Sequence, residues 1–214
     1  MLPLVTFVAF DLETTGLHPN KDEIIEVAGY KFTLRKDKGR LTAIDLGHYS
    51  SLIKPNMFIP KEATKINNIT DQMVENAPAF KKVIPEFIKF CGISTVMVAH
   101  KADFDLEFLG KALKKHQMMI PGNPVLDSLK ITKKIMVEAT SHNLGNLARK
   151  LGDQIHLTLN RQGLHRALYD CEVLKEIFCA CLRKRFQEKE LTMDKAISSI
   201  EKIHGPALHV KNFI

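Results

Sequence analysis

The chain has 214 residues, of which 45% are hydrophobic and 26% charged, a composition that is ordinary for one globular domain and excludes a disordered or repetitive chain. Lysine and arginine outnumber aspartate and glutamate by 31 to 24, so the formal net charge is +7, which is compatible with a polyanionic partner but is also produced by solvated lysines on helix faces. The four cysteines include no Cys-x-x-Cys pair, which favours reduced thiols in the cytoplasm.

The N-terminal part of the chain carries the pattern of a β-hairpin sheet. Apolar segments separated by turn residues predict three strands, at 4–10, 23–32 and 46–53. Their short connections make them antiparallel neighbours. The run 1–10 lacks the basic flank and cleavage site of a signal peptide and is too short to cross a membrane, so we expect a strand there and no membrane contact.

From Pro60 onward the pattern becomes helical, with Thr70 as an expected N-cap and an amphipathic helix that opens at Pro78 and runs to Phe90. Strands are predicted at 95–100 and 124–126, and helices at 103–116, 128–137, 143–151 and 166–185. Hairpin strands followed by alternating strands and helices predict an α/β fold, in which helices cover both faces of a mixed sheet. We expect one domain over 1–188 and a helical tail over 189–214, for whose docking the sequence has no signal.

Two carboxylates one residue apart follow the first apolar strand. Because side chains two apart on a strand point the same way, Asp11 and Glu13 should converge on one face. Like charges that close raise each other's pKa, and a divalent cation is the natural compensation. The ordinary alternative for such a pair is a solvated turn or a cap.

Two further segments place acids where a strand meets a helix or loop, the usual position of ligand sites in such sheets. In 98–109, Asp103 and Asp105 diverge by about 200° on a helix, so only one of them can join a common site. Asp103 could instead cap the helix, whereas Asp105 is the better candidate to face the sheet edge.

In the third segment, His165 and Asp170 would lie about 140° apart on a regular helix. Gly163 just upstream indicates that His165 lies in the loop or the first turn, where it can approach the same centre as Asp170. The alternative for a lone histidine is an ordinary surface or core residue.

The segments FDLETTGL, AHKADFDLEFL and HRALYD together resemble the three motifs of the DnaQ-like DEDDh family of 3′–5′ exonucleases, over about residues 5–180. The resemblance implies a ribonuclease H-like fold with a five-stranded mixed sheet flanked by helices. It selects Asp105 over Asp103 and implies that His165 is the general base. It also implies two divalent cations, Mg²⁺ or Mn²⁺, held by four acids: Asp11, Glu13, Asp105 and Asp170.

The resemblance extends to residues that would contact the terminal nucleotide, namely Thr14, Thr15, Leu17, Glu62, Asn67 and Ile69. Core packing is the alternative role for Leu17 and Ile69. The chain departs from the family at two places: Asn67-Asn68 stands where His-Gly is frequent, and Lys101 stands where Asn is usual. Asn68 can adopt the left-handed backbone that Gly would supply, whereas Lys101 adds a charge near the phosphates.

The function that follows from the resemblance is a metal-dependent 3′–5′ exonuclease that releases nucleoside 5′-monophosphates from single-stranded or frayed 3′ ends of DNA. The subgroup most like this chain proofreads for bacterial replicative polymerases, so a DNA polymerase is an expected partner. One alternative is an exonuclease that acts on RNA, of the oligoribonuclease or RNase T kind. The other is a noncatalytic module that binds nucleic acid or tethers a polymerase.

Overall fold

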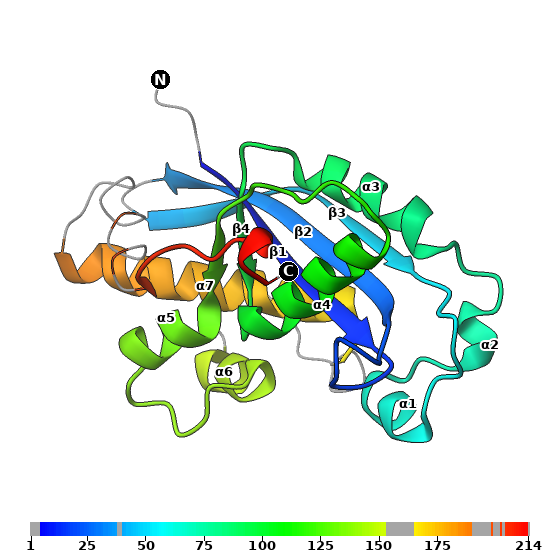
Figure 1. The fold of residues 1–214 in the computed structure, drawn as a ribbon. Coiled ribbons are helices and arrows are strands. Elements are labelled where there is room, and N and C mark those ends of the chain that lie inside the picture. The colour runs from blue at the N-terminus through cyan, green and yellow to red at the C-terminus, as the bar shows by residue number, and fades with distance from the viewer. Residues whose placement is uncertain are drawn as a thin grey trace.

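A computed structural model describes residues 5–37, 40–152, 165–189, 198, 202 and 204–213. Its centre is a five-stranded sheet in the order β3-β2-β1-β4-β5 (Figure 1). The strands β1 (Thr6–Thr14), β2 (Ile24–Asp37) and β3 (Arg40–Leu52) pair antiparallel, whereas β4 (Val96–Ala99) runs parallel to β1 and β5 (Val125–Asp127) runs parallel to β4. The mixed sheet predicted from the sequence is confirmed.

Alternate side chains of β1 enter two different cores. Phe7 and Ala9 pack with the face covered by α5 (Ser128–Ile135), α6 (Leu144–Leu151) and α7 (Ala167–Lys189). Val8 and Phe10 pack on the opposite face with α3 (Phe80–Cys91) and α4 (Ala102–Lys115). Continuing the alternation places the side chains at 11 and 13 on the α7 face, at the end of the central strand.

The predicted bounds of the three N-terminal strands were too short, whereas the strand predicted at 95–100 is longer than β4. β1 continues four residues beyond the predicted end, through both acids, because its backbone stays paired with β2, with Asp11 opposite Ala28 and Glu13 opposite Glu26. β2 and β3 likewise continue to Asp37 and from Arg40. Backbone pairing carries a strand through polar residues, whereas the apolar pattern used for prediction ends with the buried part.

Two short helices, α1 (Lys61–Asn67) and α2 (Asp71–Val74), lie beyond the end of the sheet that carries the β1–β2 turn (Figure 1). The hydroxyl of Thr70 accepts a bond from the backbone N–H of Met73, so the predicted N-cap is confirmed. Asn68 ends α1 with φ 58°, the left-handed conformation expected of it.

The possible capping role of Asp103 is wrong. Position 101 is the N-cap of α4, and Lys101, with φ 64°, makes no side-chain cap bond. The Asp103 side chain is 56% exposed and its carboxylate lies 3.8 Å from the Lys130 ammonium. The other predicted helices lie within two residues of their observed starts.

The described part of the C-terminal tail packs against the sheet edge. Leu208 forms a β-bridge with Val125, and the backbone N–H of Asp127 donates to His204 Nε2 at 2.9 Å. The 3-10 helix η2 (Val210–Phe213) lies on α4, where a Cβ at Gly110 would come within 3.0 Å of the Phe213 carbonyl oxygen. Of the helical tail expected over 189–214, positions 190–197, 199–201, 203 and 214 lie outside the described residues, and so does Gly163. No helix in the described ranges has the length and apolar character needed to span a bilayer.

Candidate active site

The end of β1, the start of α4 and the start of α7 enclose a cleft of about 550 Å³. Six of the residues predicted for the site line it: Asp11, Glu13, Leu17, Asp105, His165 and Asp170. All four acids and the histidine are therefore brought together, although they are up to 159 positions apart in sequence.

Three carboxylates form the tightest part of the cleft. Oxygen atoms of Asp11, Glu13 and Asp170 all lie within 4.8 Å of one another. Asp170 Oδ2 accepts a bond from the backbone N–H of His165 at 3.1 Å, whereas its Oδ1 is buried without a hydrogen-bond partner in the described structure. His165 precedes α7 with φ 64°, as expected for a residue in the connecting turn.

Asp105 is the acid of the second segment that faces this cluster. It is only 3% exposed, and its charge is the largest contribution after burial to the raised pKa of Asp11. Asp103 projects to solvent from the same helix. The structure therefore places Asp105 in the cleft and Asp103 outside it.

Burial, with a smaller contribution from neighbouring carboxylates, raises the pKa of all four acids. Burial, followed by the charges of Asp105 and Asp170, raises the pKa of Asp11 well above its ordinary value. Burial and the Asp170 charge raise the pKa of Glu13 to about 9. Burial also raises the pKa of Asp105 to about 8 and that of Asp170 to about 6.

These acids fit a divalent cation. The donors are all carboxylate oxygens, which hard cations such as Mg²⁺ and Mn²⁺ prefer. One of them, Asp170 Oδ1, is buried with no partner of its own among the described residues, and a buried acceptor is normally satisfied. Cations would also relieve the repulsion that raises the four pKa values.

A buried ion pair beside the cluster was missed from the sequence. Glu26 on β2 is 2% exposed, and its carboxylate accepts bonds from Arg166 Nε at 3.1 Å, Arg166 Nη2 at 2.8 Å and the Ala167 backbone N–H at 3.0 Å. The pair fixes the start of α7 next to Glu13, the residue opposite Glu26 in the sheet. A glutamate within the apolar segment 23–32 was the available signal.

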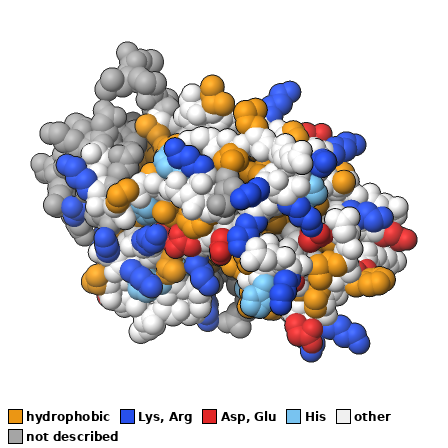
Figure 2. Space-filling view, in the orientation of Figure 1, with side chains coloured by type: hydrophobic (Ala, Val, Ile, Leu, Met, Phe, Trp, Pro, Cys, Tyr) orange, Lys and Arg blue, Asp and Glu red, His pale blue; other side chains and the backbone are white. Residues whose placement is uncertain are grey.

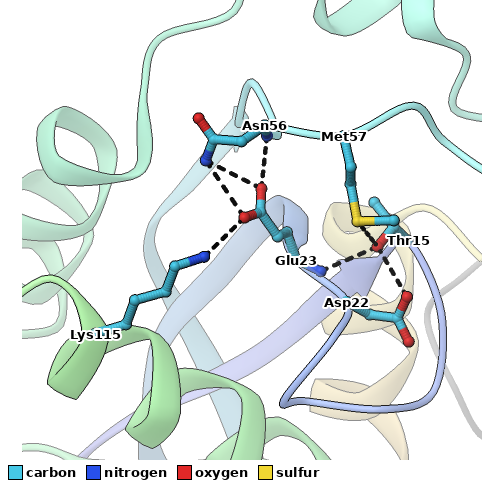
Figure 3. Close-up of polar contacts among 6 residues, drawn as sticks. All are labelled: Thr15, Asp22, Glu23, Asn56, Met57 and Lys115. Carbon is cyan, nitrogen blue, oxygen red and sulfur yellow. Dashed lines mark hydrogen bonds and ion pairs between the residues drawn. The ribbon is translucent and has the colours of Figure 1, made fainter.

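Several predicted substrate residues instead support the β1–β2 turn. Thr14 Oγ1 donates to the Gly16 carbonyl oxygen at 2.6 Å, and the Asn67 amide donates to the Thr14 carbonyl oxygen at 3.3 Å. Thr15 is buried, and its hydroxyl contacts Asp22, Glu23 and Met57 (Figure 3). None of these three lines the cleft.

The remaining predicted contacts divide between surface and core. Leu17 is 72% exposed at the mouth of the cleft, in a position to meet a ligand. Ile69 is fully buried with Ile25 and Val74, so the geometry favours its core-packing alternative. Glu62 is exposed on α1 and does not line the cleft.

The opposite wall of the cleft comes from α6 and the start of α4. Asn143 caps α6 by accepting a bond from the Asn146 N–H at 2.8 Å, and it lines the cleft with Leu144, Gly145 and Arg149. Lys101 also lines it, its backbone N–H held by Asp127 Oδ1 at 3.0 Å. The sequence predicted α6 but no role for it, because helical periodicity identifies a core face and not a cleft wall.

Comparison with known proteins gives a consistent family. The model of a family described as exonuclease, of the RNase T type, matches residues 8–178. The DNA polymerase III subunit epsilon of Aquifex aeolicus is 32% identical over 179 residues, which are 84% of this chain and 81% of that protein. The DNA polymerase III PolC-type of Thermotoga petrophila is 35% identical over 173 residues, 81% of this chain, and the chain spans 12% of its length.

A solved structure supports the fold. Exonuclease X, in complex with 5′ overhanging duplex DNA, superposes with a TM-score of 0.59 at 23% identity, covering 93% of this chain and 99% of that one. The sheet order and the flanking helices are those of a ribonuclease H-like fold. Because the family model covers most of the chain, and the epsilon subunit exceeds 30% identity over most of both lengths, the chain belongs to the exonuclease family.

Proposed function

We propose that this chain is a divalent-metal-dependent 3′–5′ exonuclease that removes nucleoside 5′-monophosphates from single-stranded or frayed 3′ ends of DNA. The observation that carries the proposal is the carboxylate cluster. Asp11, Glu13 and Asp170 lie within 4.8 Å of one another, and Asp105 is buried beside them. Cations stabilise such a cluster in its ionised form, and phosphodiester hydrolysis is a reaction that paired cations serve.

In this proposal the four acids hold two cations, Mg²⁺ or Mn²⁺. Asp11 is proposed to contact both ions, because the charges of Asp105, Asp170 and Glu13 all contribute to its raised pKa. When bound, the cations supply Lewis acidity and neutralise charge on the phosphate. Asp170 Oδ1 is the oxygen with no competing protein partner among the described atoms.

His165 is the proposed general base, the group that takes the proton of the attacking water. Its backbone N–H bonds Asp170, so the exposed imidazole is tethered to a metal ligand at the cleft mouth. An imidazole gains and loses a proton near neutral pH, which suits this task. Leu17, exposed at the same mouth, is the proposed contact for the terminal base.

The sequence relatives favour DNA as the substrate and a proofreading or repair role. The epsilon subunit matched above is a DNA polymerase III component, so a DNA polymerase is the proposed partner of this chain. Four buried cysteines, all free, are compatible with the reducing cytoplasm. The completeness of the acid and histidine set argues for an enzyme and against a noncatalytic module.

The test compares matched single-stranded DNA and RNA oligonucleotides, labelled at either end, with Mg²⁺, Mn²⁺ or EDTA. We expect stepwise loss from the 3′ end of DNA, release of 5′-monophosphates, and no reaction in EDTA. Asp170→Asn should abolish turnover, whereas Asp103→Asn, the matched change at an exposed acid, should not. Preference for RNA would move the proposal to the RNA-directed alternative, and an inactive wild type that still binds DNA would support the noncatalytic module.

A further inference from the structure

A second cavity, of about 210 Å³, lies outside the cleft, between the β1–β2 turn, the outer part of α4 and the start of α3. Its rim carries five lysines, which define the lysine pocket: Lys21, Lys54, Lys81, Lys111 and Lys115. Figure 2 shows lysine and arginine side chains across the face that carries α4, with fewer acidic side chains among them. Two of these lysines belong to the basic pairs 81–82 and 114–115.

Both carboxylates that line the pocket already bond neighbouring groups of the protein. Asp22 turns into the β1–β2 turn, where it accepts bonds from the His18 N–H at 2.8 Å and the Thr15 hydroxyl at 3.3 Å. Glu23 accepts from the Asn56 N–H at 2.6 Å and pairs with Lys115 at 2.9 Å (Figure 3). Glu107, outside the lining, pairs with Lys111 at 3.8 Å, and the other four lysines against two lining carboxylates still leave an excess of positive charge.

Part of that charge has no internal partner. Among the described residues, no carboxylate lies within 4 Å of the ammonium groups of Lys21 or Lys81. Lys54 donates only to the Glu75 carbonyl oxygen, at 2.7 Å, which leaves its charge unpaired. The like charges of Lys115 and Lys81, together with burial, lower the pKa of His116. The lysine pocket is therefore built to attract an anion.

Aromatic rings form the inner side of the same pocket. The rings of Phe80 and His116 stack with centroids 4.8 Å apart, and Phe108 lines the floor. Phe80 and Phe108 are only 8% and 2% exposed, so they form the apolar base of the pocket, and only the half-buried His116 ring lies near its rim. Several lysines along one groove match the successive phosphates of a single-stranded nucleic acid, which a small inorganic anion would not span.

The lysine pocket and the catalytic cleft are lined by different residues of the same two segments, the β1–β2 turn and α4. Leu17 lines the cleft, whereas residues 19–22 of the same turn line the pocket. On α4, Asp105 faces the cleft, and Phe108, Lys111 and Lys115 follow at helical spacing toward the pocket. Ten residues of helix span about 15 Å. An extended single strand advances farther per nucleotide than the ~3.4 Å of one strand of B-DNA, so that distance corresponds to only a few nucleotides.

We propose that the lysine pocket binds the phosphates of the substrate strand a few nucleotides to the 5′ side of the terminal nucleotide. The direction of the strand rests on the proposed function, whereas the binding of a single-stranded backbone rests on the pocket itself. The 3′ end would enter the cleft past Leu17 while the upstream strand crosses α4. The pocket would thus favour strands several nucleotides long over very short ones.

The test uses two double variants with the same change of charge. Lys21→Gln/Lys81→Gln alters two pocket lysines that have no carboxylate partner among the described residues, and Lys82→Gln/Lys114→Gln alters adjacent exposed lysines that do not line the pocket. Binding of a fluorescent 15-mer of single-stranded DNA is measured in EDTA at several salt concentrations. Each phosphate contact on a single strand contributes about 0.7 to the slope of log affinity against log salt concentration. Two such contacts therefore increase the affinity by a factor of about 25 when the salt concentration falls from 1 M to 0.1 M.

We expect the pocket variant to lose affinity by about that factor and its salt slope to fall by about 1.4. The control variant should change both quantities far less. Equal losses in the two variants would overturn the proposal, because they would reflect net charge alone. An equal loss of affinity for a blunt duplex would overturn the single-strand geometry.

A minimal substrate separates this inference from the proposed function. The p-nitrophenyl ester of thymidine 5′-monophosphate occupies only the cleft, so both variants should hydrolyse it like the wild type in Mg²⁺ or Mn²⁺. Impaired hydrolysis by the pocket variant alone would show that these lysines support the cleft, and would overturn a separate binding role. A wild type that hydrolyses neither this ester nor the DNA oligonucleotides would refute the proposed function. The binding comparison would still show whether the lysine pocket binds single-stranded DNA.

Discussion

Removing Arg166 should destabilise the protein through the carboxylate that it leaves behind. Arg166→Met keeps much of the side-chain volume but removes two bonds, of 3.1 and 2.8 Å, to a Glu26 side chain that is 3% exposed. Loss of one partner from a fully buried ion pair costs about 3–5 kcal/mol. Because the Arg166 side chain is 36% exposed and Glu26 keeps the Ala167 N–H, we expect a loss of about 2–3 kcal/mol in the free energy of unfolding.

The assay is urea unfolding in EDTA, applied to a double-mutant cycle with Glu26→Gln. The double variant has no unpaired charge, so it should recover about 1–2 kcal/mol relative to the sum of the two single changes. Lys130→Met, which removes the exposed partner of Asp103, is the control and should cost at most about 0.5 kcal/mol. An Arg166 variant as stable as this control, or single effects that simply add, would refute the reasoning.

Four further results are expected. Folding raises the pKa values of the clustered carboxyl groups, so the native protein holds protons that the unfolded chain releases. Without metal, stability is therefore greatest near pH 4 and falls as pH rises through the raised pKa values of about 6, 8 and 9. Addition of Mg²⁺ should reverse the fall in Tm above pH 6. If Tm instead rises over this range in EDTA, the acids are not buried together. Asp105→Asn should remove nearly all turnover while Asp103→Asn leaves it intact, and the opposite pattern would exchange the two assignments. His165→Ala should reduce kcat by about 10²–10⁴-fold, with cation binding by calorimetry unchanged. Asn67→Ala, which leaves the Ile69 N–H without its acceptor at 3.0 Å, should cost about 1–2 kcal/mol of unfolding free energy in urea titrations, and a smaller cost would indicate that water reaches the turn.

The sequence predicted those site residues whose placement follows from the periodicity of a single strand or helix. Alternation along a strand placed Asp11 with Glu13, and helical angles showed that only one of Asp103 and Asp105 could join the site. The choice between those two required the family resemblance, and the structure agrees with it. The mixed sheet followed from short hairpin connections and later helix alternation, which are also local signals.

The residues that were missed depend on contacts between distant parts of the chain. Glu26 and Arg166 are 140 positions apart, and no local pattern pairs them. Asn67 matches a substrate position in sequence, and its buried side chain also bonds the Thr14 carbonyl oxygen, a contact that the sequence did not predict. Whether a polar group faces a ligand or a backbone atom depends on tertiary packing, so it could not be read from residue type alone.

Two strained backbone positions flank the acids and explain how the site keeps its geometry. Lys101, immediately before α4, and His165, two residues before α7, both have φ of 64° although neither is glycine. Such conformations persist only where surrounding bonds enforce them. The Lys101 N–H is held by Asp127 and the His165 N–H by Asp170, so each strained residue is bonded at the point where its helix turns toward the cleft. The backbone bonds that hold these turns also determine where Asp105 and Asp170 enter the site. A substitution of Asp127 should therefore change the position of Asp105, although Asp127 itself does not line the cleft.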